Sequence, residues 1–170
     1  QYSTPQKLSE LLVRITIDNK TKPVLDPCCG TGTIIGEAYN LKKEYGVSEA
    51  DAIEDIWASD KYAFPLQLAM LALTKPENVG RILQIFRHDV VQLKAGMSIT
   101  FKDPTTGKNV DKQLPKLDYI VSNLPFVQQE DVRYLNPDIY QSMNGLLSRL
   151  VMMQSCPVGV IYMFLYRFIS

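Results

Sequence analysis

The chain has 170 residues, the size of one domain with a single hydrophobic core, and its 18 Lys and Arg balance its 18 Asp and Glu. This balance excludes a global positive field for nucleic acid, so any such contact must come from local patches or from parts outside the chain. The three cysteines fit neither a disulfide framework nor the paired spacing of a zinc site, and no signal segment or bilayer-spanning run is apparent, so we expect a cytoplasmic protein without a metal.

The first predicted element is an amphipathic helix near the N-terminus. It opens at Ser3-Thr4-Pro5, with a hydroxyl at the cap and proline at the first helical position. Apolar side chains then recur at helical spacing, at Leu8, Leu11, Leu12 and Ile15. Capping explains this segment as well as a ligand-binding role does, so the segment alone does not decide between them.

A glycine-rich turn between a strand and a helix organises the rest of the chain. The buried strand 23–25 is followed by Asp26, Gly30 and Gly32 form the turn, and a helix begins near Thr33. Glycine allows positive φ and a close approach of bare main chain, and the free N–H groups of the helix's first turn face the same crevice. The stretch therefore predicts a ligand loop, and a tight turn without a ligand is the alternative.

The spacing of this loop disfavours phosphate ligands. A dinucleotide fingerprint needs glycine at the first, third and sixth places, but the sixth place counted from Gly30 is Ile35, and Gly36 comes one residue late. The P-loop fails too, because no Gly-Lys-Ser or Gly-Lys-Thr follows the turn. The remaining pattern, Asp-Pro-x-Cys-Gly-Thr-Gly-Thr over residues 26–33, resembles the S-adenosylmethionine loop of class I methyltransferases.

That resemblance implies that the loop faces the amino-acid half of S-adenosylmethionine. The residues concerned are Asp26, Cys28, Gly30 and Gly32. A carboxylate at Asp26 suits the ammonium group of this cofactor better than it would suit a phosphate.

The next elements alternate between helix and strand. After the loop, the pattern predicts a helix that ends near Gly46, where glycine can adopt the left-handed conformation. We interpret the acidic segment 49–55 as a solvated connection.

A second strand, 56–60, ends at Asp60 and is followed by a helix over 65–73. An acid in this place hydrogen-bonds the ribose hydroxyls in nucleoside-binding α/β domains, so Asp60 is a candidate for that role, with a helix N-cap or a solvated end as the alternative.

A third strand, 82–86, is followed by His88-Asp89. Asp89 matches the position where the resembled family places an acid or amide against the adenine amine of the cofactor. His88, the single histidine, has no sequence partner that would make it a general base, so we interpret it as a loop residue. Segment 97–114 predicts a hairpin to which we assign no chemistry.

A fourth buried strand, 116–122, runs directly into Asn123-Leu124-Pro125-Phe126. With this tetrapeptide the chain resembles the amino-methyltransferases of the Asn-Pro-Pro-Tyr/Phe type, most of all the adenine-specific DNA methyltransferases of restriction-modification systems. The match begins at Tyr2, because Tyr2-Ser3-Thr4-Pro5 resembles the Tyr-Thr-Pro segment that precedes the family's cofactor loop. The resemblance implies that Tyr2 and Thr4 contact the cofactor.

The tetrapeptide suits transfer to an exocyclic amine, whose lone pair is delocalised into the ring. The Asn123 side-chain oxygen and the Leu124 carbonyl would each accept one amine hydrogen, which favours a pyramidal nitrogen aimed at the sulfonium methyl. Pro125 would stiffen the loop, and Phe126 would stack on an adenine rotated out of the duplex. Leu124 stands where the family has its first proline, so the fixed φ that would aim this carbonyl is lost.

We therefore expect a Rossmann-like, mainly parallel twisted sheet with helices on both faces, the class I methyltransferase fold. Asp26, Asp60, Asp89 and Asn123 should lie along its C-terminal edge. Helical spacing over 139–150 leads into an apolar run from Val158, which predicts a fifth strand. Residues 1–170 are interpreted as a single catalytic domain, a C-terminally truncated fragment without a target-recognition domain.

The predicted function is transfer of a methyl group from S-adenosylmethionine to the exocyclic amine of adenine in DNA, as the modification part of a restriction-modification system. The expected partners are DNA with a flipped adenine and a separate target-recognition domain or specificity subunit. Two alternatives stay open: a relative that methylates RNA or a protein glutamine through the same loop, and a non-catalytic subunit, for which Leu124 is the hint.

Overall fold

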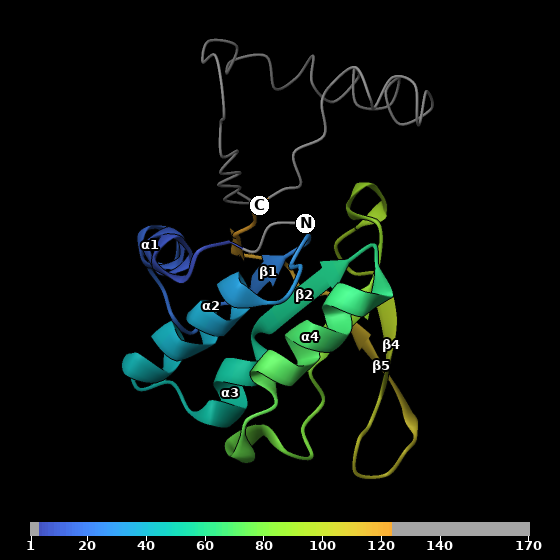
Figure 1. The fold of residues 1–170 in the computed structure, drawn as a ribbon. Helices are drawn as coiled ribbons and strands as arrows, with labels where there is room; N and C mark the ends of the chain where they lie inside the picture. Colours follow the sequence, from blue (N-terminus) through green and yellow to red (C-terminus); the bar gives the residue numbers. More distant parts are fainter. Residues whose placement is uncertain (1–3, 124–170) are drawn as a thin grey trace, which may run out of the picture. The chain divides into compact units, whose positions relative to one another are not determined.

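A parallel sheet forms the frame of residues 4–123, the part of the chain that the computed structural model describes (Figure 1). Within this part the sheet has four strands in the order β3-β2-β1-β6, and every neighbouring pair is parallel. The strands are β1 (Val24–Asp26), β2 (Ile56–Asp60), β3 (Gln84–Arg87) and β6 (Tyr119–Ile120). The predicted α/β fold with a mainly parallel sheet is thereby confirmed.

The sequence predicted helices on both faces of this sheet, whereas among residues 4–123 the helices pack on one face. They are α1 (Gln6–Thr16), α2 (Thr33–Glu44), α3 (Glu49–Glu54) and α4 (Ala63–Leu73). Their buried residues form one core with Val24, Ile56 and Ile85 of the strands. The α2 helix ends as predicted, because Gly46 takes a positive φ of 80° just beyond its last turn.

The opposite face carries the next residues of the same strands, Leu25, Trp57 and Phe86, as strand alternation requires. The predicted hairpin is confirmed as β4 (Ser98–Lys102) and β5 (Asn109–Gln113), a separate antiparallel pair. Its Phe101 meets Trp57 edge to face, with ring centroids 6.0 Å apart. The short 3-10 turns η1 (Pro76–Asn78) and η2 (Val90–Gln92) lie in the connections.

The segment 49–55, predicted to be a solvated connection, is instead mostly the helix α3. Ser48 caps it, since its Oγ accepts a hydrogen bond from Asp51 N at 3.1 Å. Ala52 and Ile53 are buried against the core, and this apolar pair supplies the stabilisation that the acidic composition concealed.

The predicted start of the first helix is also corrected. Pro5 is the N-cap, with an extended ψ of 138°, and the helix begins at Gln6 without a side-chain cap. Its buried face contains Leu12 and Val13, whereas Leu11 is 55% exposed. The hydroxyl of Thr4 is therefore available for a contact elsewhere.

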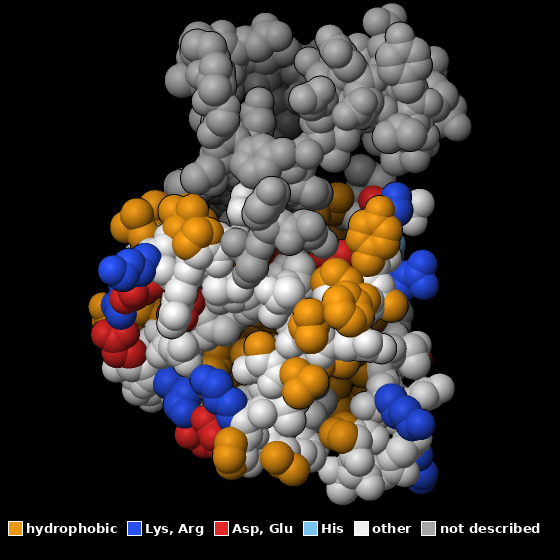
Figure 2. All heavy atoms as spheres, in the orientation of Figure 1, with side chains coloured by type: hydrophobic (Ala, Val, Ile, Leu, Met, Phe, Trp, Pro, Cys, Tyr) orange, Lys and Arg blue, Asp and Glu red, His pale blue; other side chains and the backbone are white. Residues whose placement is uncertain are grey.

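The helix α4 is apolar on two sides. Leu66, Ala69 and Leu73 are buried in the core, while Phe64, Leu68 and Leu71 are exposed, and Figure 2 shows hydrophobic side chains gathered over this helix. Periodicity alone could not have oriented such a helix. Among the described helices, none combines the length and the hydrophobicity that crossing a bilayer needs.

Several predicted features lie outside the described residues. They are Tyr2, Leu124, Pro125, Phe126 and the helix and strand expected beyond residue 138.

Candidate active site

The predicted site residues of the strands meet at one edge of the sheet. Asp26 is the last residue of β1 and Asp60 the last of β2, while Asp89 and Asn123 come shortly after β3 and β6. Because these four strands are parallel, their carboxyl ends share an edge. The placement predicted for Asp26, Asp60, Asp89 and Asn123 is therefore confirmed.

The two glycines of the loop have different functions. Gly32 precedes α2 with φ +85°, and a Cβ added there would lie 2.9 Å from both Cα and Cβ of Ala69. Glycine is required at this position because α4 packs directly against the turn. Gly30 also has positive φ, +52°, but an added Cβ would meet nothing within 4 Å. Open space therefore adjoins the backbone of Gly30, as a ligand loop requires.

Asp60 holds this loop from the neighbouring strand. Its Oδ2 accepts a hydrogen bond from Gly30 N at 3.1 Å, and its Oδ1 accepts one from Tyr62 N at 2.9 Å. The side chain is 5% exposed. Tyr62, not Asp60, is the N-cap of α4, so the helix-capping alternative does not describe this residue. Asp60 is instead a buried anchor for the glycine turn.

Asp26 connects the glycine loop to the segment before Asn123. Its Oδ1 accepts hydrogen bonds from Cys28 N at 3.1 Å and from Ser122 Oγ at 2.6 Å. With 1% of its surface exposed, Asp26 is strongly desolvated, and this raises its pKa from 3.8 to about 7. The two hydrogen bonds oppose the rise, and the nearby charge of Asp60 adds to it. Sequence reasoning missed Ser122, for which the sequence offered no local signal.

The carboxylates make the loop electrostatically negative. Burial is the largest cause that raises the pKa of Cys28 to about 12, and the charges of Asp26, Asp60 and Asp89 contribute to the same rise. Burial likewise raises the pKa of Cys29. Both thiols thus stay protonated at neutral pH and are not nucleophiles. A loop surrounded by three carboxylates repels a polyphosphate and suits a ligand that offers ammonium, hydroxyl or amine donors.

Asp89 lies at the rim of the site rather than inside it. Its side chain is 23% exposed, and its Oδ2 forms an ion pair with Lys61 Nζ at 3.1 Å. His88 donates its backbone N–H to the Asp60 carbonyl at 3.0 Å, which fixes this turn against β2. The acid at this position is thus accessible to a ligand, and His88 is the loop residue that the sequence predicted.

Asn123 is joined to the N-terminal segment. Its Nδ2 donates a hydrogen bond to Thr4 Oγ1 at 3.1 Å, and both residues are half-buried. Two segments that the sequence assigned to cofactor and to target are therefore in direct contact.

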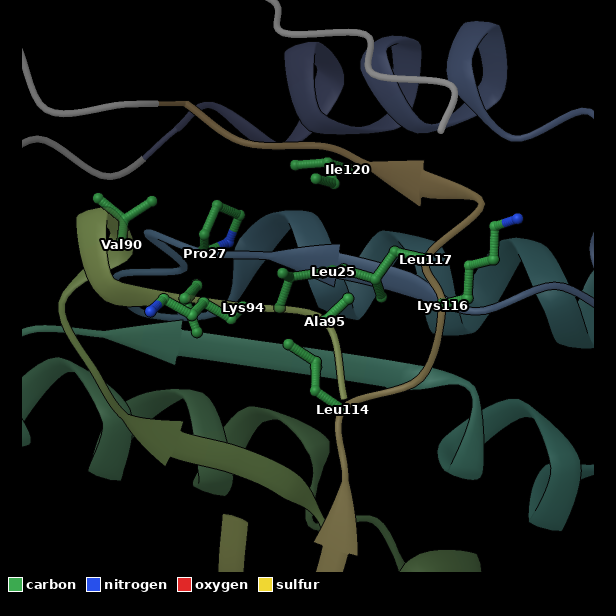
Figure 3. Close-up of a pocket in the computed structure, with 10 residues that line it drawn as sticks. Leu25, Pro27, Val90, Lys94, Ala95, Leu114, Lys116, Leu117 and Ile120 are labelled. Carbon is green, nitrogen blue, oxygen red and sulfur yellow. The ribbon is translucent and has the colours of Figure 1, made fainter. Parts of the chain in front are cut away.

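An apolar cavity of about 210 Å³ adjoins the same edge (Figure 3). Pro27 and Val90, which directly follow Asp26 and Asp89, lie at one end, and Lys116 lies at the other. Leu25, Leu117 and Ile120 line its middle. Residues 4–123 contain no cluster of His, Cys, Asp and Glu side chains suited to holding a metal ion.

Comparisons with known proteins agree with this geometry. No match was found among curated proteins. The family model described as N-6 DNA methylase matches residues 1–146 of the 170-residue chain, a range that includes the glycine loop, the strand-end acids and the tetrapeptide. The chain therefore belongs to the N-6 DNA methylase family, a family of adenine-specific DNA methyltransferases.

Proposed function

We propose that this protein transfers a methyl group from S-adenosylmethionine to the exocyclic amine of adenine in DNA. The observation that supports this most directly is the position of Asn123, which follows β6 at the sheet edge that also carries the glycine loop. Family membership establishes the general class, and the site supports the specific cofactor and acceptor.

The residues present fit S-adenosylmethionine better than a phosphate ligand. The open space beside Gly30 admits a ligand to bare main chain, and three carboxylates act on the loop that borders it. When bound, the cofactor supplies an electrophilic methyl group on a sulfonium. Asp26 and Asp60 would supply negative charge beneath the loop for the ammonium and ribose ends of the cofactor, respectively. Asp89 at the rim would accept a hydrogen from the amine of the cofactor's adenine.

Further contacts extend the proposed cofactor site. The loop backbone at Cys28 would contact the amino-acid half, and we assign further contacts with that half to Tyr2 and Thr4. Pro27 and Val90, at the end of the apolar cavity next to Asp89, offer a hydrophobic surface for the flat adenine ring.

The transfer itself depends on orientation rather than on a strong base. Asn123 Oδ1 and the Leu124 carbonyl would accept the two amine hydrogens, which favours a pyramidal nitrogen with an available lone pair. When that nitrogen gains a methyl group, one of its two hydrogens would leave as a proton to solvent. The fixed φ of Pro125 would stiffen the tetrapeptide, and the ring of Phe126 would stack on the extruded base.

The biological setting that we propose is the modification part of a restriction-modification system. The equal numbers of basic and acidic residues support a division of labour in which a separate domain or subunit supplies the positive surface that selects the DNA sequence. Residues 1–170 then form the catalytic domain.

The test is nucleoside analysis of DNA, RNA and protein from cells that lack their own adenine methylation and express the full-length protein. We expect N6-methyladenine in DNA from cells with the wild type and none from cells with Asn123→Ala. A methylated RNA base or a methylated protein glutamine would identify a different acceptor, and no product with intact cofactor binding would identify a non-catalytic subunit.

A further inference from the structure

The Asn123 carboxamide has two ends with opposite hydrogen-bonding roles, and one of them serves the proposed reaction. Oδ1 can accept a hydrogen from the target amine, whereas the Nδ2 group can only donate. The torsion that exchanges the two ends is broad and roughly two-fold, so the side chain does not by itself hold Oδ1 towards the target. A neighbouring group must select the orientation.

Thr4 is placed to make this selection. Its Oγ1 accepts the hydrogen bond from Asn123 Nδ2 at 3.1 Å, across 119 residues of sequence. The next residue, Pro5, accepts hydrogen bonds from the backbone N–H groups of Leu8 and Ser9, both at 3.0 Å, so Thr4 is fixed relative to α1. The start and the end of the described range lie close together at this point (Figure 1).

The selection depends on the single hydrogen of the Thr4 hydroxyl. If that hydrogen is donated into the crevice, a lone pair is left for Nδ2, and Oδ1 is presented to the target amine. If the hydroxyl hydrogen finds no acceptor in the crevice, the hydroxyl can donate it to Oδ1 instead. Nδ2 of Asn123 then faces the target amine, and both of these groups are hydrogen-bond donors, so no hydrogen bond forms between them. Within residues 4–123, the Thr4 hydroxyl has no hydrogen-bond partner besides Asn123.

We propose that Thr4 is a positioning residue for methyl transfer, whose hydroxyl turns the Asn123 carboxamide so that Oδ1 faces the target amine. This inference rests on the proposed function. The acceptor that completes the arrangement is an anionic oxygen in the crevice, and the carboxylate of S-adenosylmethionine has this chemistry. Cofactor binding and the orientation of Asn123 are thereby linked through one hydroxyl.

The first test compares Thr4→Val, which removes the hydroxyl at nearly constant shape, with Thr4→Ser, which retains it. Single-turnover methylation of an adenine-containing duplex is measured at saturating S-adenosylmethionine, beside calorimetric titration of the cofactor. We expect Thr4→Val to transfer about ten- to a hundredfold more slowly even at saturation, and Thr4→Ser to stay within about threefold of wild type. A Thr4→Val enzyme that regains the full rate at saturation contacts only the cofactor, and the inference is then wrong.

The second test uses Asn123→Asp, whose two equivalent oxygens have no wrong orientation. If Thr4 acts by orienting the amide, adding Thr4→Val to Asn123→Asp should change the single-turnover rate by less than about threefold. The same loss in both backgrounds would overturn the inference. Thr16→Val, at the other end of α1, is the matched control and should leave both the rate and the cofactor affinity unchanged.

The outcomes also separate this inference from the proposed function. A wild type that binds S-adenosylmethionine but methylates no adenine in DNA contradicts the proposed function and the inference with it. A wild type that methylates adenine, with Thr4→Val equally fast at saturation, contradicts the inference alone.

Discussion

Replacing Asp26 by asparagine tests how a buried, ionisable carboxyl group beneath the glycine loop affects the stability of the fold. Asparagine keeps an oxygen that can accept from Cys28 N and Ser122 Oγ, but it cannot ionise. The substitution therefore removes the charge while it leaves the two observed hydrogen bonds in place.

The expected effect on stability follows from the pKa of Asp26, which burial raises from 3.8 to about 7. Well below pH 3.8 the carboxyl is protonated in both states, so the pKa difference has no effect. Between about pH 4 and pH 7 the unfolded chain loses the proton while the folded protein keeps it, so the free energy of unfolding falls as pH rises and stays lower above pH 7. At about 1.4 kcal/mol for each pH unit between the two values, the loss reaches at most roughly 4 kcal/mol.

Urea unfolding of both proteins between pH 4 and pH 8 measures this directly. Fluorescence of Trp57, the single tryptophan of the chain and a buried residue of β2, reports the transition. Asp26→Asn should be close to wild type in stability near pH 4 and more stable at pH 8. Subtracting the unfolding free energies of the two proteins at each pH removes the contribution of all other titrating groups. A difference that is constant with pH, or that favours wild type at pH 8, would refute the reasoning.

The same substitution should weaken cofactor binding, because an ammonium group loses its buried anionic partner. Loss of a charge-assisted contact commonly costs about 1.5–3 kcal/mol, or roughly tenfold to a hundredfold in affinity. Calorimetry with S-adenosylmethionine at pH 8 measures this. A variant that is more stable and yet binds less tightly would show that the buried charge serves binding at the expense of stability. Unchanged affinity would exclude Asp26 from the cofactor site.

Three further predictions concern single positions. Asn123→Ala should leave the affinity for S-adenosylmethionine near that of wild type, while the single-turnover rate of methyl transfer falls about a hundredfold to a thousandfold. Transfer at the wild-type rate would exclude this residue from the mechanism. Gly32→Ala should lower the free energy of unfolding in urea by roughly 2–4 kcal/mol, because alanine is strained at this positive φ and its Cβ would lie 2.9 Å from Ala69. Gly30→Ala should lower it by only about 1 kcal/mol, because its Cβ would meet no other atom within 4 Å. Lys42→Ala should lower the free energy of unfolding by about 2–4 kcal/mol in the same assay. The substitution leaves the Asp55 carboxylate and the carbonyls of Lys20 and Lys22 without their buried ammonium partner. A loss below about 1 kcal/mol would contradict this.

The features that sequence predicted correctly follow local rules. Gly46 beyond α2 and the hairpin over 97–114 each depend on neighbouring residues alone. The acids at or just beyond the ends of β1, β2 and β3 could be placed at one edge because consecutive parallel strands end on the same side. Alternation and turn chemistry were enough for these elements.

The errors arose where composition and periodicity conflicted with packing. The acidic residues of 49–55 indicated exposure, but Ala52 and Ile53 bury one side of that helix. In α1 the apolar pattern included Leu11, which the structure exposes. A short helix with one apolar pair gives too weak a period to be read from sequence.

The links between the parts of the site were outside the reach of any sequence pattern. Ser122 and Asp26 are 96 residues apart, and Asn123 and Thr4 are 119 apart, yet each pair shares a hydrogen bond. Their meeting depends on β6 pairing beside β1, and a sequence that shows only strand ends does not give the order of strands. The sequence thus supplied the residue types, and the sheet topology supplied the contacts.

The structure also gives a physical reason why this loop does not suit phosphate, beyond its glycine spacing. In a dinucleotide site, backbone N–H groups of the glycine turn and of the following helix are left for the pyrophosphate. Here the first glycine of the turn already uses its N–H within the protein, because Gly30 N donates to Asp60 at 3.1 Å, and Cys28 N just before the turn donates to Asp26 at 3.1 Å. A phosphate would have to displace a buried carboxylate from each donor and then bear the repulsion of both. A ligand that brings an ammonium and hydroxyl groups meets no such competition, because the same carboxylates that order the turn also offer it their charge.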